Sequence, residues 1–527
     1  MPDAPALISS GLTDDERDTL KKLREQLRAK EKRNRLRSAY YDGKHRLRNM
    51  GISIPPSMQD IETVVGWPAK SVDVLEQRLE LDGFVRPNQS EADQGISEAW
   101  ADNDMDLEAS QAHVSALTHG TAFVFVTKGE ADSDDPDVVI SPRSARQATA
   151  IANRRKRRIE SALEVITGEK GSDRYVVLHL PGTSITLERN GREWSVEHRS
   201  GHSMRRVPCV PLVHRPFIER TFGMSRITRP VMSLTDTAVR TALRTEVSAE
   251  FYSSPQRYLL GADEEAFQDK DGRVKTGWET ILGRMLAIPH PEPDENGERP
   301  PEMRVGQFAQ ASMQPHTEHL RSVAMMFSGE TAIPVSYLGV IHDNPASADA
   351  IRAGEAELVK VAERAQLTFG AGWSTVGQLV VMVRDGLDEV PDDLSRLRPK
   401  WRDASTPTRQ AMAQSVMSLV SVGVLPPDAE VTYEQLGLDQ TTIERLMAEK
   451  RRREAAAALD RLTGAAASAV MSPEEMKARA DAMGVLIRAG VSTESAARQV
   501  GLEGIEFTGA IPVSLRVPDS QASQLED

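Results

Sequence analysis

Three stretches in the middle of the chain carry apolar residues at helical spacing. From Ser225 to Tyr252 the apolar side chains recur at steps of seven and four, which places them on one face of a helix. A second helix is expected from Met313 to Ser328, and a longer one from Ala348 to Val383. The stripe on the first of these helices consists of Met232, Val239, Leu243, Val247 and Phe251.

The first two hundred residues mix helical and strand patterns. A charged amphipathic helix is expected from Thr13 to Asn49, and a second helical pattern runs from Val72 and ends at Gly83. A third helix carries Leu107 and ends near Gly120. Strands are predicted at Ala122 to Val126, Val138 to Ile140, Tyr175 to Leu180, Ser184 to Leu187 and Trp194 to His198. This part of the chain is therefore predicted to be α+β.

Turn-rich sequence separates the central helices. Short apolar runs at Arg257 to Leu260 and Arg284 to Ile288 predict a small β-containing insertion between the first two helices. A polar loop, Gly339 to Ser347, precedes the long helix, and Ser347 is a good capping residue for it. The chain after about Ala404 is almost wholly helical, and a polar tail after Ile511 is expected to be disordered.

The composition indicates a large protein with much surface for its core. The 527 residues are 39% hydrophobic, 5% aromatic and 27% charged, a balance that long solvated helices or an elongated shape would produce. A formal net charge of -13 is the opposite of what a tight nucleic-acid binder shows, because phosphate neutralisation needs clustered Lys and Arg. We therefore do not expect the chain as a whole to bind DNA tightly.

One basic run stands out against this acidic background. The helix from Thr13 to Asn49 carries clustered cations at helical spacing. A solvated helix face is the favoured interpretation, and a contact with nucleic acid or a partner is the alternative. The cations are Lys30, Lys32, Arg33, Arg35 and Arg37.

No segment of the sequence indicates a membrane protein. The start of the chain has no basic segment followed by an apolar one, and no apolar run approaches the roughly 20 residues that span a bilayer. The single cysteine, Cys209, has no partner for a disulfide or a zinc site, which indicates a reducing site of synthesis. We therefore expect neither a membrane partner nor a metal.

The motifs of catalysis are missing from the sequence. There is no Gly-rich phosphate loop and no G-x-S-x-G elbow, so neither nucleotide hydrolysis nor nucleophilic catalysis has a candidate. His316 and His319 stand three apart on a predicted helix without an obvious third ligand, which favours structural histidines over a metal site. Cys209 lies in an apolar extended segment and is expected to be a buried, inert thiol. We therefore expect that the protein is not an enzyme and binds no cofactor.

Several short motifs, taken in order, resemble the portal proteins of tailed bacteriophages, especially the group typified by phages of Gram-positive and actinobacterial hosts. The resemblance spans about 36–383, and its specificity comes from order and spacing, since no piece is diagnostic alone. The motifs are Tyr40-Tyr41-x-Gly43, Val65-Gly66-Trp67-Pro68-x-x-x-Val72-Asp73, Gly83-Phe84, Ala112-His113, Gly120-x-Ala122-Phe123-Val124, Gly223-Met224-Ser225-Arg226-Ile227, Glu250-Phe251, Pro255-Gln256-Arg257 and Asn344-Pro345-x-Ser347-Ala348-x-Ala350-Ile351.

The resemblance implies a portal fold of the α+β class with a wing, a helical stem, a clip and an all-α crown. The implied parts are a charged N-terminal helix and α+β wing (1–224), a first stem helix (225–253), a β-containing clip (254–314), a second stem helix (315–338), a tunnel loop (339–347), a long helix returning to the wing (348–403), a helical crown (404–505) and a disordered tail (506–527). The crown and the charged N-terminus match no family motif.

The resemblance also implies a function and partners. Twelve copies would form a ring at one capsid vertex of the virion, made in the host bacterial cytoplasm, for genome packaging, head-to-tail joining and DNA ejection. Double-stranded DNA would pass through without sequence reading, and the ring would contact the terminase motor, a head-to-tail adaptor and the major capsid protein. The alternatives are another capsid-associated protein, such as an adaptor or minor head protein, or a packaging enzyme.

Two groups of residues are singled out by this assignment. The tunnel loop presents His342, Asp343, Asn344 and Ser347, and we expect Asp343 and Asn344 at or near the narrowest point, unless the loop is an ordinary surface turn. An acidic or mixed wall would keep DNA contacts weak. The stripe from Met232 to Phe251 would pack either between neighbouring subunits or within one subunit's own core.

Overall fold

The computed structural model describes residues 9–46, 62–86, 95–130, 134–156, 158–167, 173–190, 193–253, 257–260, 304–307, 312–340, 348–405, 409–467, 472–502 and 505–506. The chain divides into two compact units, Met1–Met412 and Ala413–Asp527. Helices and strands both contribute to the first unit, and helices alone are found in the described residues of the second, so the fold is α+β. No helix within the described residues is long and apolar enough to cross a membrane.

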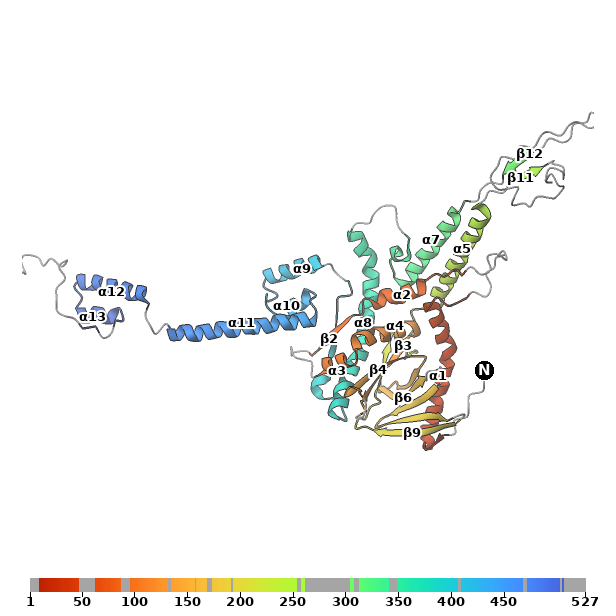
Figure 1. Cartoon of the computed structure of the whole chain (residues 1–527), viewed down its shortest axis with the longest axis horizontal. Coiled ribbons are helices and arrows are strands. Elements are labelled where there is room, and N and C mark those ends of the chain that lie inside the picture. Colours follow the sequence, from red (N-terminus) through yellow and green to blue (C-terminus); the bar gives the residue numbers. More distant parts are fainter. Residues whose placement is uncertain are drawn as a thin grey trace, which may run out of the picture. The chain divides into compact units, whose positions relative to one another are not determined.

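A long N-terminal helix covers a six-stranded sheet (Figure 1). Helix α1 (Asp14–Tyr41) begins with a capping box in which Thr13 and Glu16 satisfy each other's backbone N–H groups. Leu20 and Leu23 on this helix are fully buried against the sheet. The sheet follows the order β1 (Ser9–Ser10), β9 (Glu193–Gly201), β8 (Thr183–Asn190), β7 (Asp173–Leu180), β6 (Arg158–Thr167) and β5 (Ala148–Asn153), antiparallel except between β1 and β9.

A three-stranded antiparallel sheet lies at the centre of the largest core. Its order is β10 (Cys209–Val213), β3 (Thr121–Lys128) and β4 (Val138–Ser144). Helix α4 (Met105–His119) and the long helix α8 (Ala348–Asp385) pack on this sheet, joined by α3 (Ile96–Asp102) and α2 (Trp67–Glu76). Strand β3 is buried over its first six residues, as its continuous apolar run predicted.

The helical pattern predicted from Val72 to Gly83 is wrong in its second half. Helix α2 ends at Glu76, and Leu81–Val85 is instead strand β2. This strand pairs antiparallel with β13 (Arg398–Trp401), which lies more than three hundred residues along the chain. A local pattern contains no information about so distant a partner, so the pairing overrides the helical spacing.

The sequence did not predict several features of the N-terminal unit. Strands β5 and β6 were not predicted at all, although β6 is buried over its second half. Leu107 lies on α4 as predicted, but its side chain is 64% exposed. Helix α1 ends at Tyr41, where Gly43 in the left-handed region closes the turn; Asn49 lies outside the described residues.

The central helices form close to their predicted bounds. Helix α5 (Arg229–Ser253) and helix α7 (Gln314–Thr331) pack side by side (Figure 1). A short 3₁₀ helix, η3 (Val335–Leu338), follows α7. Helix α5 begins at Arg229, four residues after the predicted start at Ser225, and Ser225 is buried and donates to the Thr118 carbonyl. Between α5 and α7, β11 (Arg257–Leu260) pairs with β12 (Arg304–Gln307), while the strand predicted at Arg284 to Ile288 lies outside the described residues.

The second unit is helical over its described residues. It contains α9 (Arg409–Ser421, which begins just before it), α10 (Glu430–Gln435), α11 (Gln440–Ala467), α12 (Pro473–Arg488) and α13 (Thr493–Gln499). Its pairs α10–α11 and α12–α13 are in contact, as a protein built from short helical hairpins requires. The prediction of a helical C-terminal region is confirmed for these residues. A last short 3₁₀ helix, η4 (Asp392–Leu394), precedes β13 in the first unit.

Candidate functional site

The predicted stripe on α5 is only partly covered within one chain. Leu243 is buried, with 1% of its surface accessible, but Met232, Val239 and Val247 are only partly buried. Phe251 lies within α5, in its last turn. A single copy of the chain therefore covers only part of the apolar surface that the sequence places on this helix.

Another face of α5 carries the burial within the chain. Val231, Thr235 and Ala238 are buried at steps of four and three. At 3.6 residues per turn they lie roughly a quarter of the circumference away from Met232 and Val239. Threonine hydroxyls along the helix donate to the carbonyl four residues earlier, at 2.8 to 3.0 Å, which satisfies these polar groups without a tertiary partner.

Helix α7 also has one buried face and one exposed face. Val323 and Phe327 are fully buried, and the Phe327 ring lies 5.2 Å from that of Trp67 on α2. Met325 and Met326, between them in sequence, are 50% and 54% exposed. The pair of helices is thus anchored to the core at one side and presents methionines at another.

A buried arginine connects α5 and α7 to helix α2. The Arg226 guanidinium, just before α5, donates to the carbonyl of Ser71 on α2 and, at 2.7 Å, to the carbonyl of Thr331 at the end of α7. Burial lowers the pKa of Arg226 to about 10, aided by repulsion from Arg215. The free carbonyls at the end of α7 are a favourable partner for a cation. Arg226 therefore holds three helices at one point.

The residues on both sides of the predicted tunnel loop are also held in place. Tyr337 on η3 donates a hydrogen bond to Glu355 on α8 at 2.5 Å, and Arg78 forms a 3.1 Å ion pair with the same carboxylate. Burial raises the pKa of Tyr337, helped by its hydrogen bond to Glu355. The loop residues themselves, His342, Asp343, Asn344 and Ser347, lie outside the described residues. The two ends of the loop are nevertheless tied to one buried ion pair.

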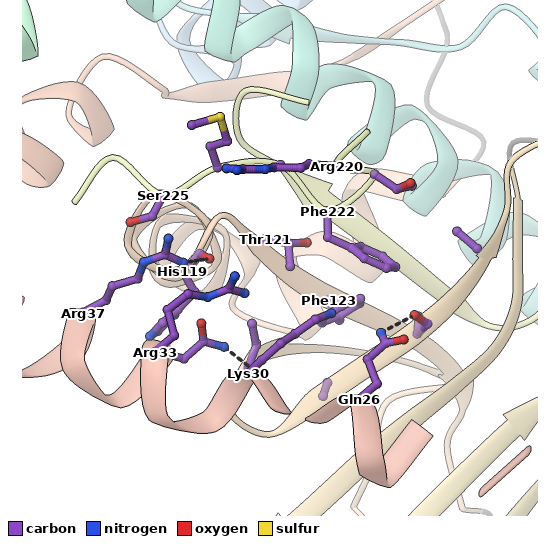
Figure 2. Close-up of a pocket in the computed structure, with 18 of the residues that line it drawn as sticks. Gln26, Lys30, Arg33, Arg37, His119, Thr121, Phe123, Arg220, Phe222 and Ser225 are labelled. Carbon is purple, nitrogen blue, oxygen red and sulfur yellow. Dashed lines mark hydrogen bonds between the residues drawn. The ribbon is translucent and has the colours of Figure 1, made fainter. Parts of the chain in front are cut away.

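A cavity of about 900 Å³ lies beside α1, and we call it the α1 pocket. Figure 2 shows Lys30, Arg33 and Arg37 projecting into it from successive turns of α1, with Arg220 on the opposite wall. Phe123 and Phe222 form an apolar part of the lining (Figure 2). The pocket is therefore both strongly basic and partly aromatic.

The cations of the α1 pocket are crowded together. Burial lowers the pKa of Lys30 to about 8, and repulsion from Arg33 contributes. Burial also lowers the pKa of Arg37 to about 10, with further repulsion from Arg33 and Arg220. Among the ion pairs formed by the described residues, none includes Lys30, Arg33, Arg37 or Arg220. Lys30 instead lies 4.8 Å from the Phe222 ring centroid, and Arg37 donates to the His119 carbonyl.

Sequence reasoning noticed these cations but not the cavity. The pattern of charges on α1, taken by itself, favours a solvated helix face. The steps of three and four between Lys30, Arg33 and Arg37 could have shown that they share a face, but Arg220 is brought to them only by tertiary folding.

The cysteine and the two histidines that the sequence singled out lie within the described residues. Cys209 is a buried, free thiol whose pKa burial raises well above its ordinary value. His316 and His319 lie on α7, and no group of three His, Cys, Asp or Glu side chains suited to a metal occurs in the described part of the chain.

Comparison with known proteins identifies close sequence relatives. A family model described as "Phage portal protein, SPP1 Gp6-like" matches residues 20–455. The portal protein of Mycobacterium phage L5 is 31% identical over 398 residues, which cover 74% of this chain and 79% of that protein. The portal protein of Mycobacterium phage D29 is 30% identical over 399 residues, covering 74% and 80%.

Solved structures show a more distant likeness. One, described as "Virion of native gene transfer agent (GTA) particle", is 12% identical with a TM-score of 0.36, covering 71% of this chain and 89% of that one. Another, described as "Neck of native GTA particle computed with C12 symmetry", is 14% identical with a TM-score of 0.35, covering 71% and 89%.

Proposed function

This chain belongs to the SPP1 Gp6-like family of phage portal proteins, and on that premise we propose that twelve copies close into a ring whose central channel carries DNA through one capsid vertex. The observation that carries the proposal is the family match over residues 20–455. It favours a portal over an adaptor, a minor head protein or a packaging enzyme. The role proposed is structural, with no catalytic step assigned to any residue.

In this ring α5 and α7 are the stem helices that line and build the channel wall. Ring closure needs two different surfaces on each copy, one for each neighbour. The partly buried stripe of Met232, Val239 and Val247 on α5 and the exposed Met325 and Met326 on α7 are apolar surfaces of this kind. Their incomplete burial within one copy favours packing between subunits over packing within one core.

The remaining parts take the roles that the family resemblance implies. Residues 1–224 form the wing and 348–403 the long helix that returns to it, the β-containing insertion 254–314 forms the clip, and 404–505 form the crown. The clip would face the terminase motor during packaging and the head-to-tail adaptor afterwards, while the major capsid protein would surround the ring in the virion. These assignments rest on the order of elements along the chain.

The loop of residues 339–347 is proposed to reach the DNA. The Tyr337–Glu355–Arg78 contacts supply fixed attachment points on both sides of it. We expect Asp343 and Asn344 to touch the DNA weakly, without reading bases. Replacing both by alanine should change packaging yield or DNA retention in an in vitro packaging assay, with Ser328→Ala, on α7, as the control. Wild-type packaging and retention would contradict this role.

Electron microscopy of the purified chain tests the ring directly. Two-dimensional class averages should show rings with a central hole, and mass photometry should give a mass near twelve copies of the 58.0 kDa chain. A compact monomer at every protein concentration would overturn the proposal.

A further inference from the structure

The residues that line the α1 pocket are suited to binding an anion. Lys30, Arg33 and Arg37 share one face of α1, and Arg220 faces them from across the cavity (Figure 2). One carboxylate, that of Glu219, also lines the cavity, but no ion pair joins it to these cations in the described residues. An arrangement of like charges is unfavourable while empty and becomes favourable when an anion enters.

The pocket wall also contains buried polar atoms without a partner. Asn34 is 1% exposed; its side-chain amide donates to the Ala145 carbonyl at 3.1 Å, but its Oδ1 accepts no hydrogen bond. The Nε of Arg37 is likewise buried and unpaired. Unsatisfied buried groups cost stability, so both atoms indicate that something else completes the site.

The shape of the pocket selects among possible anions. Lys30 and Arg37 are partly buried in a recess with apolar walls that include Phe123 and Phe222, whereas Arg33 and Arg220 are exposed at its mouth. The helix is held against the sheet because Gln26 donates to Thr149 and to the Ala150 carbonyl. A rigid DNA duplex contacts exposed basic ridges with its phosphates and cannot enter such a recess. A short protein segment with carboxylates and an apolar side chain fits it better.

The same unit presents such a segment elsewhere on its surface. The turn between α3 and α4, which we call the acidic turn, exposes Asp102, Asp104 and Asp106 together with Leu107, whose side chain is 64% exposed. Asn103 fixes the turn in place, because its side chain donates to the Val138 carbonyl and accepts from the Ile140 N–H, each at 2.8 Å.

The acidic turn and the α1 pocket do not meet within one copy. Helices α1 and α3 lie on opposite sides of the N-terminal unit in Figure 1. Two complementary surfaces on opposite sides of a subunit are what a head-to-tail ring interface requires. The overall charge of -13 also means that each copy offers acidic surface in excess for a basic pocket on its neighbour.

We propose that the α1 pocket of one copy receives the acidic turn of the next, with Asp102 and Asp106 facing Arg33 and Arg220 and with Leu107 against the apolar wall. This contact rests on the ring of the proposed function and adds a second interface, in the wing, to that of the stem. Electrostatic complementarity of this kind fixes the register and orientation in which two copies associate.

Charge reversal on both sides tests the contact in the full-length chain. The pocket variant is Arg33→Glu with Arg220→Glu, and the turn variant is Asp102→Lys with Asp106→Lys; all four side chains belong to exposed residues. Each variant should need at least about tenfold more protein for half-assembly, measured by mass photometry. The chain carrying all four substitutions should assemble again, because every interface then pairs Glu with Lys.

A matched control separates position from net charge. Lys32→Glu with Arg35→Glu changes the net charge by the same amount as the pocket variant, on the same helix, at exposed residues that do not line the cavity. This control should assemble as the wild type does. Raising the salt concentration should weaken wild-type assembly more than assembly of the pocket variant.

Three outcomes would overturn the contact. One is a pocket variant that assembles at wild-type concentrations, and another is a fourfold variant that does not recover. The third is a pocket variant that loses affinity for duplex DNA, measured by fluorescence anisotropy, while assembling normally, because the pocket would then serve nucleic acid. If the wild-type chain itself formed no rings, the proposed function would fail; if the wild type and the pocket variant formed rings at the same concentrations, only this contact would fail.

Discussion

Two buried histidines, His113 and His214, and the partly buried His119 illustrate how single side chains serve this fold. His113 accepts a 2.8 Å hydrogen bond from the Trp373 indole and stacks on Phe369, with ring centroids 5.1 Å apart. Burial lowers its pKa to about 3, and it lowers the pKa of His214 to about 3 and that of His119 to about 4. All three imidazoles are therefore neutral near pH 7 and act as packing groups with hydrogen-bonding atoms.

These pKa values predict that the protein loses stability in mild acid. Below pH 6.5 these histidines become protonated in the unfolded chain, whereas in the folded chain they stay neutral until about pH 3 to 4. Each histidine should thus lower the free energy of unfolding by about 1.4 kcal/mol per pH unit over this window. His113→Gln removes one such group, so its loss of stability between pH 7 and pH 5 should be smaller by about 2 kcal/mol.

Chemical denaturation at the two pH values measures this difference. The Gln side chain can still accept from the Trp373 indole, so the variant should remain folded at pH 7, although less well packed. His198→Gln, at an exposed position of β9, provides the matched control and should leave the pH dependence of stability as it is in the wild type. An equal loss for His113→Gln and the wild type would show that His113 is not kept neutral by burial.

At the scale of elements, α5 and α7 each have one face buried in the core and a second apolar face that the chain itself does not fully cover. The faces through Val231 and Ala238 on α5 and through Val323 and Phe327 on α7 are buried within the chain. The apolar residues beside them are not, and exposed apolar surface of this kind marks interaction sites more often than chance. The proposed contact between subunits would explain why both helices are apolar over more than one stripe.

A substitution on the exposed side of α7 separates assembly from folding. Met326 is 54% exposed, so Met326→Asp should leave the monomer's thermal unfolding within a degree or two while preventing ring formation by placing a charge in the interface. Met476→Asp, at 52% exposure on α12, is the matched control and should assemble. By contrast, Leu243→Asp buries a carboxylate in the chain's own core and should cost about 3 kcal/mol or more.

Circular dichroism for folding and mass photometry for assembly are sufficient to read out these variants. Rings from Met326→Asp at wild-type concentrations would show that this side of α7 faces solvent in the ring.

At the scale of the whole chain, the N-terminal unit combines distant segments and the C-terminal unit does not. Strand β2 pairs with β13, and the core beneath them includes Trp373 from α8 and His113 from α4. The N-terminal unit therefore cannot be complete without residues near 400. The C-terminal unit is built from neighbouring helices in contact along the sequence.

This difference predicts that the C-terminal unit is dispensable for folding of the rest. A chain ending at Met412 keeps β13 and every strand of the N-terminal unit, so it should retain the wild-type near-ultraviolet circular dichroism of its buried tryptophans and unfold cooperatively. A chain ending at Asp385, which lacks β13, serves as the comparison and should be destabilised. Loss of cooperative unfolding in the Met412 chain would show that the two units fold together.

The sequence alone determined most of the helices, because periodic apolar positions and end signals are local. Helices α5, α7 and α8 and strand β3 fall close to where spacing and Gly or Ser end signals put them. The motif order identified the family as well, since order and spacing survive where no single motif is diagnostic.

Tertiary structure alone decided what depends on distant partners. Strand β2 became a strand because β13 pairs with it, and the basic face of α1 became a pocket because Arg220 and Phe222 return to it from two hundred residues away. It also divided the apolar stripe of α5 between the core and a second surface, because burial depends on which neighbour covers each side of a helix, and local spacing does not contain that neighbour.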